Sequence, residues 1–280
     1  MRAARTMMGM LAAALTIVGT LVAGRTATRR RFDREMAALL AARRPSGLPP
    51  TARDLSELPL PIQRWLQWSR AVDRQMPAVV RLRQTGRLRD APGTSWRSFV
   101  AQQGYTLDPP GFVWVARVPV APLVELVVTD RFRAGRGAAE VRLFGLVPIA
   151  RGAGPELDQG ALSRFLDETM WFPAAALLPA IRWEPIDATR ARATMIDGAT
   201  SVAAVFTIDD RGRFLTVEAD RFRTVGDRLV LTPWATPARD WGRFDGVRMP
   251  TAGAGVWRLP SGDFTYIELH VTDVDYDESR

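Results

Sequence analysis

Three side chains in this sequence have the chemistry for acid–base catalysis. Glu184 and Asp187 flank Pro185, and paired carboxylates can act as general acid and base when they are partly buried. His270, the single histidine, follows Glu268 by two residues, a spacing at which the pair could relay a proton. No nucleophile of known context accompanies them, and turn formation or a structural strand position explains them more simply. We therefore assign no catalytic residue, and a hydrolase-type enzyme that uses Glu184, Asp187 or His270 is the alternative hypothesis.

The composition limits several other kinds of site. All 38 basic residues are arginine, which excludes a Schiff-base lysine and the phosphate-binding lysine of a P-loop. Cysteine is absent, and one histidine severely limits zinc sites. Residues 273–277 superficially resemble a calcium loop, but the required glycine and distant glutamate are missing, so we interpret them as an acidic strand end. We expect no metal and no cofactor.

The aromatic residues favour binding of an apolar ligand. The chain holds nine tryptophans, which could line a groove as readily as they fill a core. Core packing is the simpler interpretation of any single one. The candidates for ligand contact fall on or near predicted apolar faces: Trp114, Phe165, Trp171, Phe172, Trp183, Phe206 and Trp257.

The net charge of +8 is concentrated at the start of the chain. Residues 1–44 hold nine arginines against Asp33 and Glu35, so this segment carries +7 and the rest about +1. The arginines flank the uncharged stretch 6–24, a pattern typical of a membrane anchor and not of a nucleic-acid surface. The predicted partner is therefore a lipid bilayer, contacted through residues 6–24, and no nucleic-acid partner is predicted.

The stretch 6–24 is just long enough to cross a thin bilayer as a helix. An uncleaved anchor at residues 1–31 is favoured over a signal peptide cleaved near residues 22–24, because arginines follow directly. This predicts a single-pass protein of the cell membrane, with arginines after the span that weakly favour a cytoplasmic domain. Residues 32–50 are interpreted as a helical stalk followed by a proline-rich linker.

One helical pattern stands in the middle of the chain. Apolar side chains recur at helical spacing between residues 162 and 170, which predicts a helix over 158–172 with Asp158 as its N-cap. Its apolar face needs a sheet to pack against. Asp167 and Glu168 fall on the opposite side and are predicted to be solvated. A shorter amphipathic helix is predicted over residues 58–72.

Segments with period two predict antiparallel strands on both sides of this central helix. Short turns connect them, and Asp197-Gly198 is the sharpest hairpin pattern. In the first strand the arginines at alternate positions are predicted to lie on a solvated outer face: Arg81, Arg83, Arg87 and Arg89. The predicted strands cover residues 78–89, 95–105, 111–118, 124–132, 138–147, 190–196, 200–208, 213–222, 228–233, 253–259 and 264–274.

So many antiparallel strands around a single internal helix predict an α+β fold. We expect a strongly curved sheet, or half-barrel, wrapped around the central helix, in one β-rich domain over residues 51–280. The tetrad Asp-Arg-Phe-Arg occurs at 130–133 and again at 220–223, which hints at duplicated halves. Coincidence in an arginine-rich sequence explains this match more simply.

Four segments carry a resemblance to a known family: 111–117, 154–166, 171–178 and 183–194. Together and in this order they resemble a bacterial family known as the domain of unknown function sixty-five forty-four, over roughly residues 55–276. The resemblance implies one domain after an N-terminal hydrophobic segment and implies no activity. More distantly, the expected sheet over a helix is similar to the half-barrels of bacterial lipoprotein carriers and related envelope lipid-binding proteins, although this chain lacks their lipobox cysteine.

These patterns favour a membrane-anchored protein that binds or carries an apolar ligand, such as a lipid or acyl chain, between the sheet and the central helix. The analogy with envelope carriers favours a domain outside the cytoplasm, against the weak charge bias toward the cytoplasm. The hydrolase-type enzyme described above is one alternative. A scaffold or interaction protein of the cell envelope is another.

Overall fold

A single antiparallel sheet dominates the computed structural model, which describes residues 2–42 and 55–277. The alternating patterns of the sequence form strands because most of these strands bury one face. The sheet has 13 strands: β1 Val79–Leu88, β2 Arg97–Thr106, β3 Gly111–Ala121, β4 Val124–Arg133, β5 Arg136–Leu143, β6 Val147–Ala153, β7 Ile181–Pro185, β8 Arg190–Asp197, β9 Thr200–Ile208, β10 Phe214–Val225, β11 Arg228–Ala235, β14 Ala252–Leu259 and β15 Gly262–Asp277.

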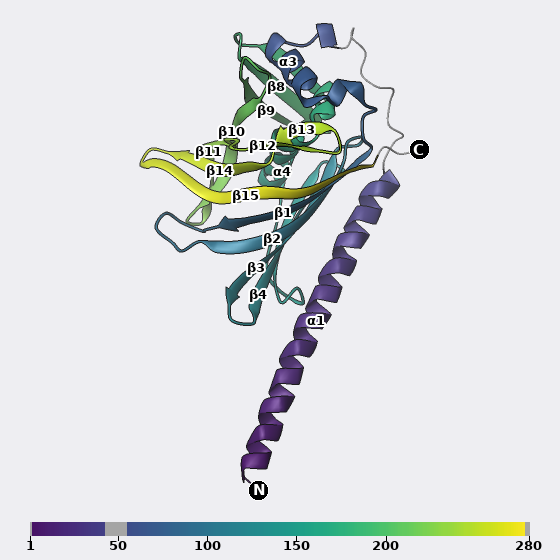
Figure 1. Ribbon diagram of the computed structural model, residues 1–280. Coiled ribbons are helices and arrows are strands. Elements are labelled where there is room, and N and C mark those ends of the chain that lie inside the picture. Colours follow the sequence, from purple (N-terminus) through teal and green to yellow (C-terminus); the bar gives the residue numbers. More distant parts are fainter. Residues whose placement is uncertain (1, 43–54, 278–280) are drawn as a thin grey trace.

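The sheet curls into the half-barrel that the sequence predicts (Figure 1). Its strand order is β6-β5-β4-β3-β2-β1-β15-β14-β11-β10-β9-β8-β7. The first strand pairs with the last, so two successive meanders become one continuous sheet. A separate two-stranded ribbon, β12 Trp241–Phe244 with β13 Val247–Pro250, lies beside it. The segment predicted as one strand over 138–147 is two strands, because the chain turns at Phe144 and Gly145, which both have positive φ.

The central helix α4, Pro155–Glu168, packs inside the curl and continues into the 3₁₀ turns Thr169–Trp171 and Pro173–Leu177. Leu162, Phe165 and Leu166 are fully buried in a core shared with inward side chains of the sheet. The predicted N-cap is wrong, because the helix begins earlier, after Gly154. The Asp158 carboxylate instead accepts a hydrogen bond from the Gly137 amide at 2.7 Å.

A second helix, α3 Leu60–Ser69, closes one end of the half-barrel. Its Trp65 is fully buried, with ring centroids 5.9 Å from Phe206 and 6.1 Å from Phe214. A short 3₁₀ turn, Ala71–Asp73, follows it. The helix predicted over residues 58–72 is thus present in a shorter form.

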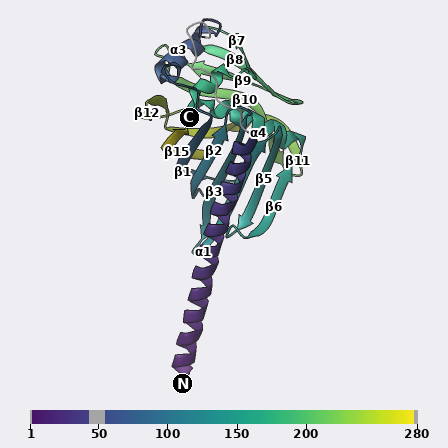
Figure 2. The same cartoon turned by 90° about the vertical axis from the view of Figure 1, so that its right-hand side faces the viewer.

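A long N-terminal helix, α1 Arg2–Ala42, lies on the outer face of the sheet and projects beyond it (Figure 2). Met36 and Leu39 are buried against Val113 and Val115 of β3. A side chain at Gly104 of β2 would overlap the Met36 sulfur, so this glycine permits the close approach of the helix. The helix runs without a break through the expected boundary between anchor and stalk, and the proline-rich linker lies outside the described residues.

The structure does not support the transmembrane anchor predicted at residues 6–24. Within the described part of the chain, no helix is both long and apolar enough to cross a membrane. The side chains of residues 6, 7 and 9–15 lie outside the described part. Beyond them the helix soon becomes polar, with arginines at positions 25, 29, 30 and 31.

Leu39→Ala tests the contact between α1 and the sheet. Removal of this buried side chain is expected to weaken the packing of α1 by about 2–5 kcal/mol. Amide hydrogen exchange in residues 31–42 should then become faster. Arg34→Ala, at an exposed position of the same helix, is the control and should leave exchange unchanged. Equal exchange in Leu39→Ala and wild type would contradict the docking of the helix.

Candidate functional site

A cavity of about 470 Å³ lies between the C-terminal half of α4 and the concave face of the sheet. We call it the half-barrel cavity. It is bounded by the end of α4 and the following 3₁₀ turn, by Leu88 and Arg89 at the end of β1, and by residues of β3, β4, β10, β11, β14 and β15. Its apolar wall consists of Trp114, Val128, Met170, Trp171, Trp234, Trp257, Phe264, Ile267 and Leu269.

Two positions of strand β14 that border the cavity are glycines. In the antiparallel register Gly253 pairs with Leu269 and Gly255 with Ile267, and directly opposed residues share one face of a sheet. Leu269 and Ile267 line the cavity, so both glycines are on the same inner face. The glycines allow neighbouring groups to approach closely: an added Cβ at Gly253 would meet the Pro237 carbonyl at 3.1 Å, and one at Gly255 would meet Ile267 and Tyr266 at 2.8 Å.

The seven aromatic candidates from the sequence divide into two groups. Trp114, Trp171 and Trp257 line the cavity. The remaining four belong to the core or pack against it: Phe165, Phe172, Trp183 and Phe206. Trp183, for example, packs edge-on against Phe206, and its indole N–H donates to the Ala176 carbonyl at 2.8 Å.

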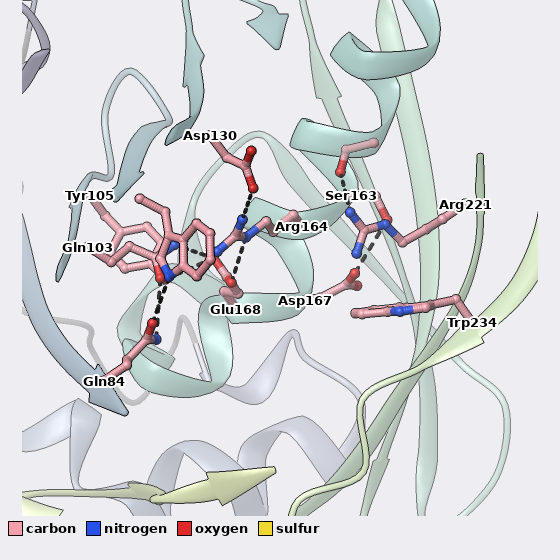
Figure 3. A network of polar contacts seen from close by, with 12 residues as sticks. Gln84, Gln103, Tyr105, Asp130, Ser163, Arg164, Asp167, Glu168, Arg221 and Trp234 are labelled. Carbon is pink, nitrogen blue, oxygen red and sulfur yellow. Dashed lines mark hydrogen bonds and ion pairs between the residues drawn. The ribbon is translucent and has the colours of Figure 1, made fainter. Parts of the chain in front are cut away.

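Charged side chains form the polar wall, and amide side chains behind them extend the network (Figure 3). Arg164 of α4 bonds the Asp130 carboxylate of β4 at 2.9 Å and Glu168, one helical turn later, at 2.8 Å. Its guanidinium also lies 5.0 Å from the ring centroid of Trp114. Burial by itself would lower the pKa of Arg164, but the charges of Glu168 and Asp130 outweigh it and raise that pKa. Burial raises the pKa of Asp130, against the attraction of Arg164.

Glu168 extends the network to strand β2. Its Oε2 accepts hydrogen bonds from the Gln103 amide at 2.7 Å and from the Tyr105 hydroxyl at 2.8 Å. Gln84 bonds Gln103 and accepts the indole N–H of Trp114 at 2.9 Å. Burial and the nearby Glu168 charge raise the pKa of Tyr105. Tyr105 is therefore a neutral donor that stabilises the Glu168 carboxylate.

Asp167 also faces the cavity, and its carboxyl group is only partly satisfied. The side chain is 1% exposed, and Ser163 donates to Oδ2 at 3.3 Å. Oδ1 is buried without a hydrogen-bond partner among the described residues. Burial raises the pKa of Asp167 to about 7, with a further contribution from Glu168 and an opposing one from Arg221. The prediction of Asp167 and Glu168 as a solvated pair is wrong, because the curled sheet encloses this side of the helix too.

Two arginines on the inner face of β10 were not identified from the sequence. Arg221 stacks over Trp234 at 4.5 Å and donates to the Gly160 carbonyl at 3.1 Å. Arg223 lies 6.0 Å from the ring centroid of Trp257, and its Nε is buried without a partner. Neither has an ion pair within the described residues. The second Asp-Arg-Phe-Arg tetrad contains both, but the sequence pattern does not show which of its residues point inward.

The polar candidates from the sequence are not brought together. His270 is exposed on β15, and Glu184 is exposed on β7, at the far edge of the sheet. Asp187 is exposed in the following turn, where it accepts the backbone N–H groups of Thr189 and Arg190 at 2.9 and 2.8 Å. These bonds and the Arg190 side chain lower the pKa of Asp187. In the described chain no group of three His, Asp or Glu residues could hold a metal ion.

The chain matches the family described as "Family of unknown function (DUF6544)" over residues 49–269, and it belongs to this family. No curated protein matches it. Among solved structures it is similar to a DUF1329 family protein from Desulfovibrio piger, at 12% identity and a TM-score of 0.45, over 83% of this chain and 95% of that one. A LolA superfamily protein from Nitrosomonas europaea is similar at 14% identity and a TM-score of 0.42, over 78% of this chain and 94% of that one. At these scores the function must be argued from the cavity itself.

Asp167→Asn tests the buried carboxyl group. The folded protein keeps a proton at Asp167 up to about pH 7, whereas the unfolded chain loses it near 3.8. The free energy of unfolding should therefore fall between these pH values, by up to about 4 kcal/mol. Asp167→Asn should remove this slope and be more stable than wild type above pH 7.

Urea denaturation at several pH values measures this effect. Asp187→Asn is the control, because the pKa of this exposed carboxyl is lowered out of the relevant pH range. The slope should persist in the control. A slope that also persists in Asp167→Asn would contradict the raised pKa of Asp167.

Arg164→Leu tests the ion-pair network. The change leaves Asp130 and Glu168 without their shared cation, and loss of one partner from a buried pair costs about 3–5 kcal/mol. Arg182→Leu, at an exposed position of β7, should change stability by less than about 0.5 kcal/mol. Urea denaturation at neutral pH measures both. Equal stability of the two variants would show that the network does not stabilise the fold.

Proposed function

We propose that this protein binds and carries an apolar or amphipathic small molecule, such as a lipid or acyl chain, in the half-barrel cavity. The observation that carries this proposal is a cavity of about 470 Å³ whose wall is mostly aromatic and aliphatic. Its volume lies in the range of about 300–1,000 Å³ that is usual for small-ligand pockets. Each methylene transferred from water to such a wall contributes about 0.8 kcal/mol.

The surroundings of the cavity support the same function. Thr224, at the end of β10, lines the cavity, and the hairpin that follows carries exposed apolar side chains. These residues are between 42% and 51% exposed: Val225, Leu229, Val230 and Leu231. An exposed apolar hairpin beside a cavity provides a path along which an apolar ligand stays in contact with apolar surface. Because Glu184, Asp187 and His270 share no site, the geometry favours binding over hydrolysis.

Leu269→Trp and His270→Trp form a matched test of ligand binding. These neighbours on β15 face opposite sides of the sheet, so the first adds a ring inside the cavity and the second adds the same ring outside. The probe is the neutral fluorescent compound N-phenyl-1-naphthylamine. Leu269→Trp should weaken its binding at least about tenfold, and His270→Trp should not change it. Equal probe binding by both variants would contradict the cavity as the binding site.

A chain-length series tests the same proposal in the wild-type protein. 1-Octanol and 1-decanol compete with the probe, and the two extra methylenes should strengthen binding about tenfold. Circular dichroism shows whether Leu269→Trp is folded. Equal affinity for the two alcohols, or no competition by either, would refute the proposed function.

A further inference from the structure

We propose that the half-barrel cavity selects an anionic amphiphile, whose acyl chain lies along the tryptophan wall and whose head group binds Arg221 and Arg223. This inference rests on the proposed function, because it names the class of ligand for the same cavity. Two observations carry it: the arrangement of the two arginines on β10, and the balance of charges on the facing helix.

Arg221 and Arg223 are placed to act together. They are two residues apart on one strand, so their side chains leave the same face about 7 Å apart. Arg221 stacks on Trp234 at 4.5 Å, and Arg223 lies 6.0 Å from the ring centroid of Trp257; the two tryptophans are paired with each other across β11 and β14. When a guanidinium packs face to face on an aromatic ring, its N–H groups lie in the plane of the guanidinium and point outward from its edges. They can then donate hydrogen bonds to a planar or tetrahedral anion. Trp234 thus orients Arg221 along the cavity wall, and Trp257 lies beside Arg223.

These two arginines differ from most others on the curled sheet. Arg87 bonds Glu268 at 2.7 Å, and Arg258 bonds Glu218 and Asp263. Arg89, which also lines the cavity, donates to the Thr265 carbonyl at 2.8 Å. Arg221 and Arg223 have no such carboxylate within ion-pair distance among the described residues, and the Nε of Arg223 is buried with no partner at all. A buried donor without a partner costs free energy, and an anionic oxygen would satisfy it.

The facing helix does not neutralise these cations. Arg164 forms the close ion pairs with Asp130 and Glu168, so Asp130 acts on Arg221 of β10 only from beyond ion-pair distance. Asp167 remains, and it faces Arg221, with Ser163, Arg164 and Glu168 on its own helix around it. Below about pH 7 Asp167 carries no charge, and Asp130, which is already paired with Arg164, is then the carboxylate that acts on Arg221. Above that pH, Asp167 competes with a bound anion for Arg221.

Three ligands with the same ten-carbon chain test the head-group selection: 1-decanol, 1-decanesulfonate and decyltrimethylammonium. Each competes with N-phenyl-1-naphthylamine on the full chain, near pH 6. The sulfonate should bind at least about tenfold more tightly than the alcohol, and the ammonium more weakly than the alcohol. Equal or tighter binding of the alcohol would refute head-group selection while the proposed function stands. Failure of all three to compete would refute the proposed function itself.

Arg223→Gln tests the residues that carry the selection. It should lower the affinity for decanesulfonate about tenfold and leave that for decanol unchanged, and Arg221→Gln/Arg223→Gln should remove the difference between the two ligands. The double variant Arg182→Gln/Arg192→Gln, at exposed positions of β7 and β8, loses the same charge and should behave as wild type. Because Arg221 also bonds the Gly160 carbonyl, thermal unfolding of each variant is measured. If the double variant is unfolded, the result for the single variant Arg223→Gln provides the test. Unchanged sulfonate selectivity in Arg223→Gln would overturn the assignment.

The pH dependence gives a second, independent test. Decanesulfonate keeps its charge throughout, so a change in its affinity reports on the protein. Wild type should bind it more weakly as pH rises from about 6 to about 8, and Asp167→Asn should bind it equally across this range. Decanol binding should be independent of pH in both proteins. A wild-type affinity for decanesulfonate that does not change with pH would exclude the competition between Asp167 and the anion.

Discussion

One guanidinium shared between two carboxylates connects the central helix to the sheet. Arg164 and Glu168 are on α4, Asp130 is on β4, and Glu168 is in turn bonded by Tyr105 and Gln103 of β2. Such a buried arrangement is stable only when each charge and each lone pair has a partner. Because the partners belong to separate strands, the network determines how the helix lies within the curl. The position of the cavity follows from this orientation of the helix.

The helix spans the two arms of the curved sheet, and the space between them is not filled everywhere. Near its N-terminal end, Asp158 bonds Gly137 of β5, and the Gly160 carbonyl accepts from Arg221 of β10. Toward its C-terminal end the facing strand is β14, where Gly253 and Gly255 present no side chains. The cavity thus lies where a helix held by polar contacts faces the glycine positions of β14 and the side chains of β15. In the rest of the core, closely packed side chains fill the space between the helix and the sheet.

The arginines of the domain divide by what surrounds them. Arg87 and Arg164 face carboxylates and contribute to the fold, whereas at the cavity Arg221 stacks on Trp234 and Arg223 lies near Trp257. Arginine suits the second role because its planar group packs against an aromatic ring while its N–H groups stay available. The same residue type therefore supports both structure and the proposed recognition. Asp167 is buried beside this site. Its raised pKa makes its charge, and therefore its attraction for Arg221, depend on pH near neutrality.

The local patterns of the sequence were sufficient to predict the half-barrel, the central helix and the hairpin at Asp197-Gly198. Period-two and helical spacing indicate which residues share a face, and short turns indicate which strands are neighbours. Three of the seven aromatic candidates line the cavity, since an inward aromatic residue has the same pattern in a core and in a wall. Whether an inward aromatic residue belongs to the core or to the cavity wall depends on its distance from the opposite strand. A local sequence pattern does not determine that distance.

The two copies of the tetrad Asp-Arg-Phe-Arg have the same local sequence, but the tertiary structure turns different faces of them inward. At 130–133 Phe132 is buried in the core, and Arg131 and Arg133 point outward to Glu35 of α1. At 220–223 the same four residues are in the opposite phase, so that Arg221 and Arg223 point into the cavity. The sequence by itself determined that each tetrad is a strand end with two alternating faces. Only the pairing of distant strands and the enclosure of α4 decided which face is inside, because burial is a property of the neighbours and not of the strand.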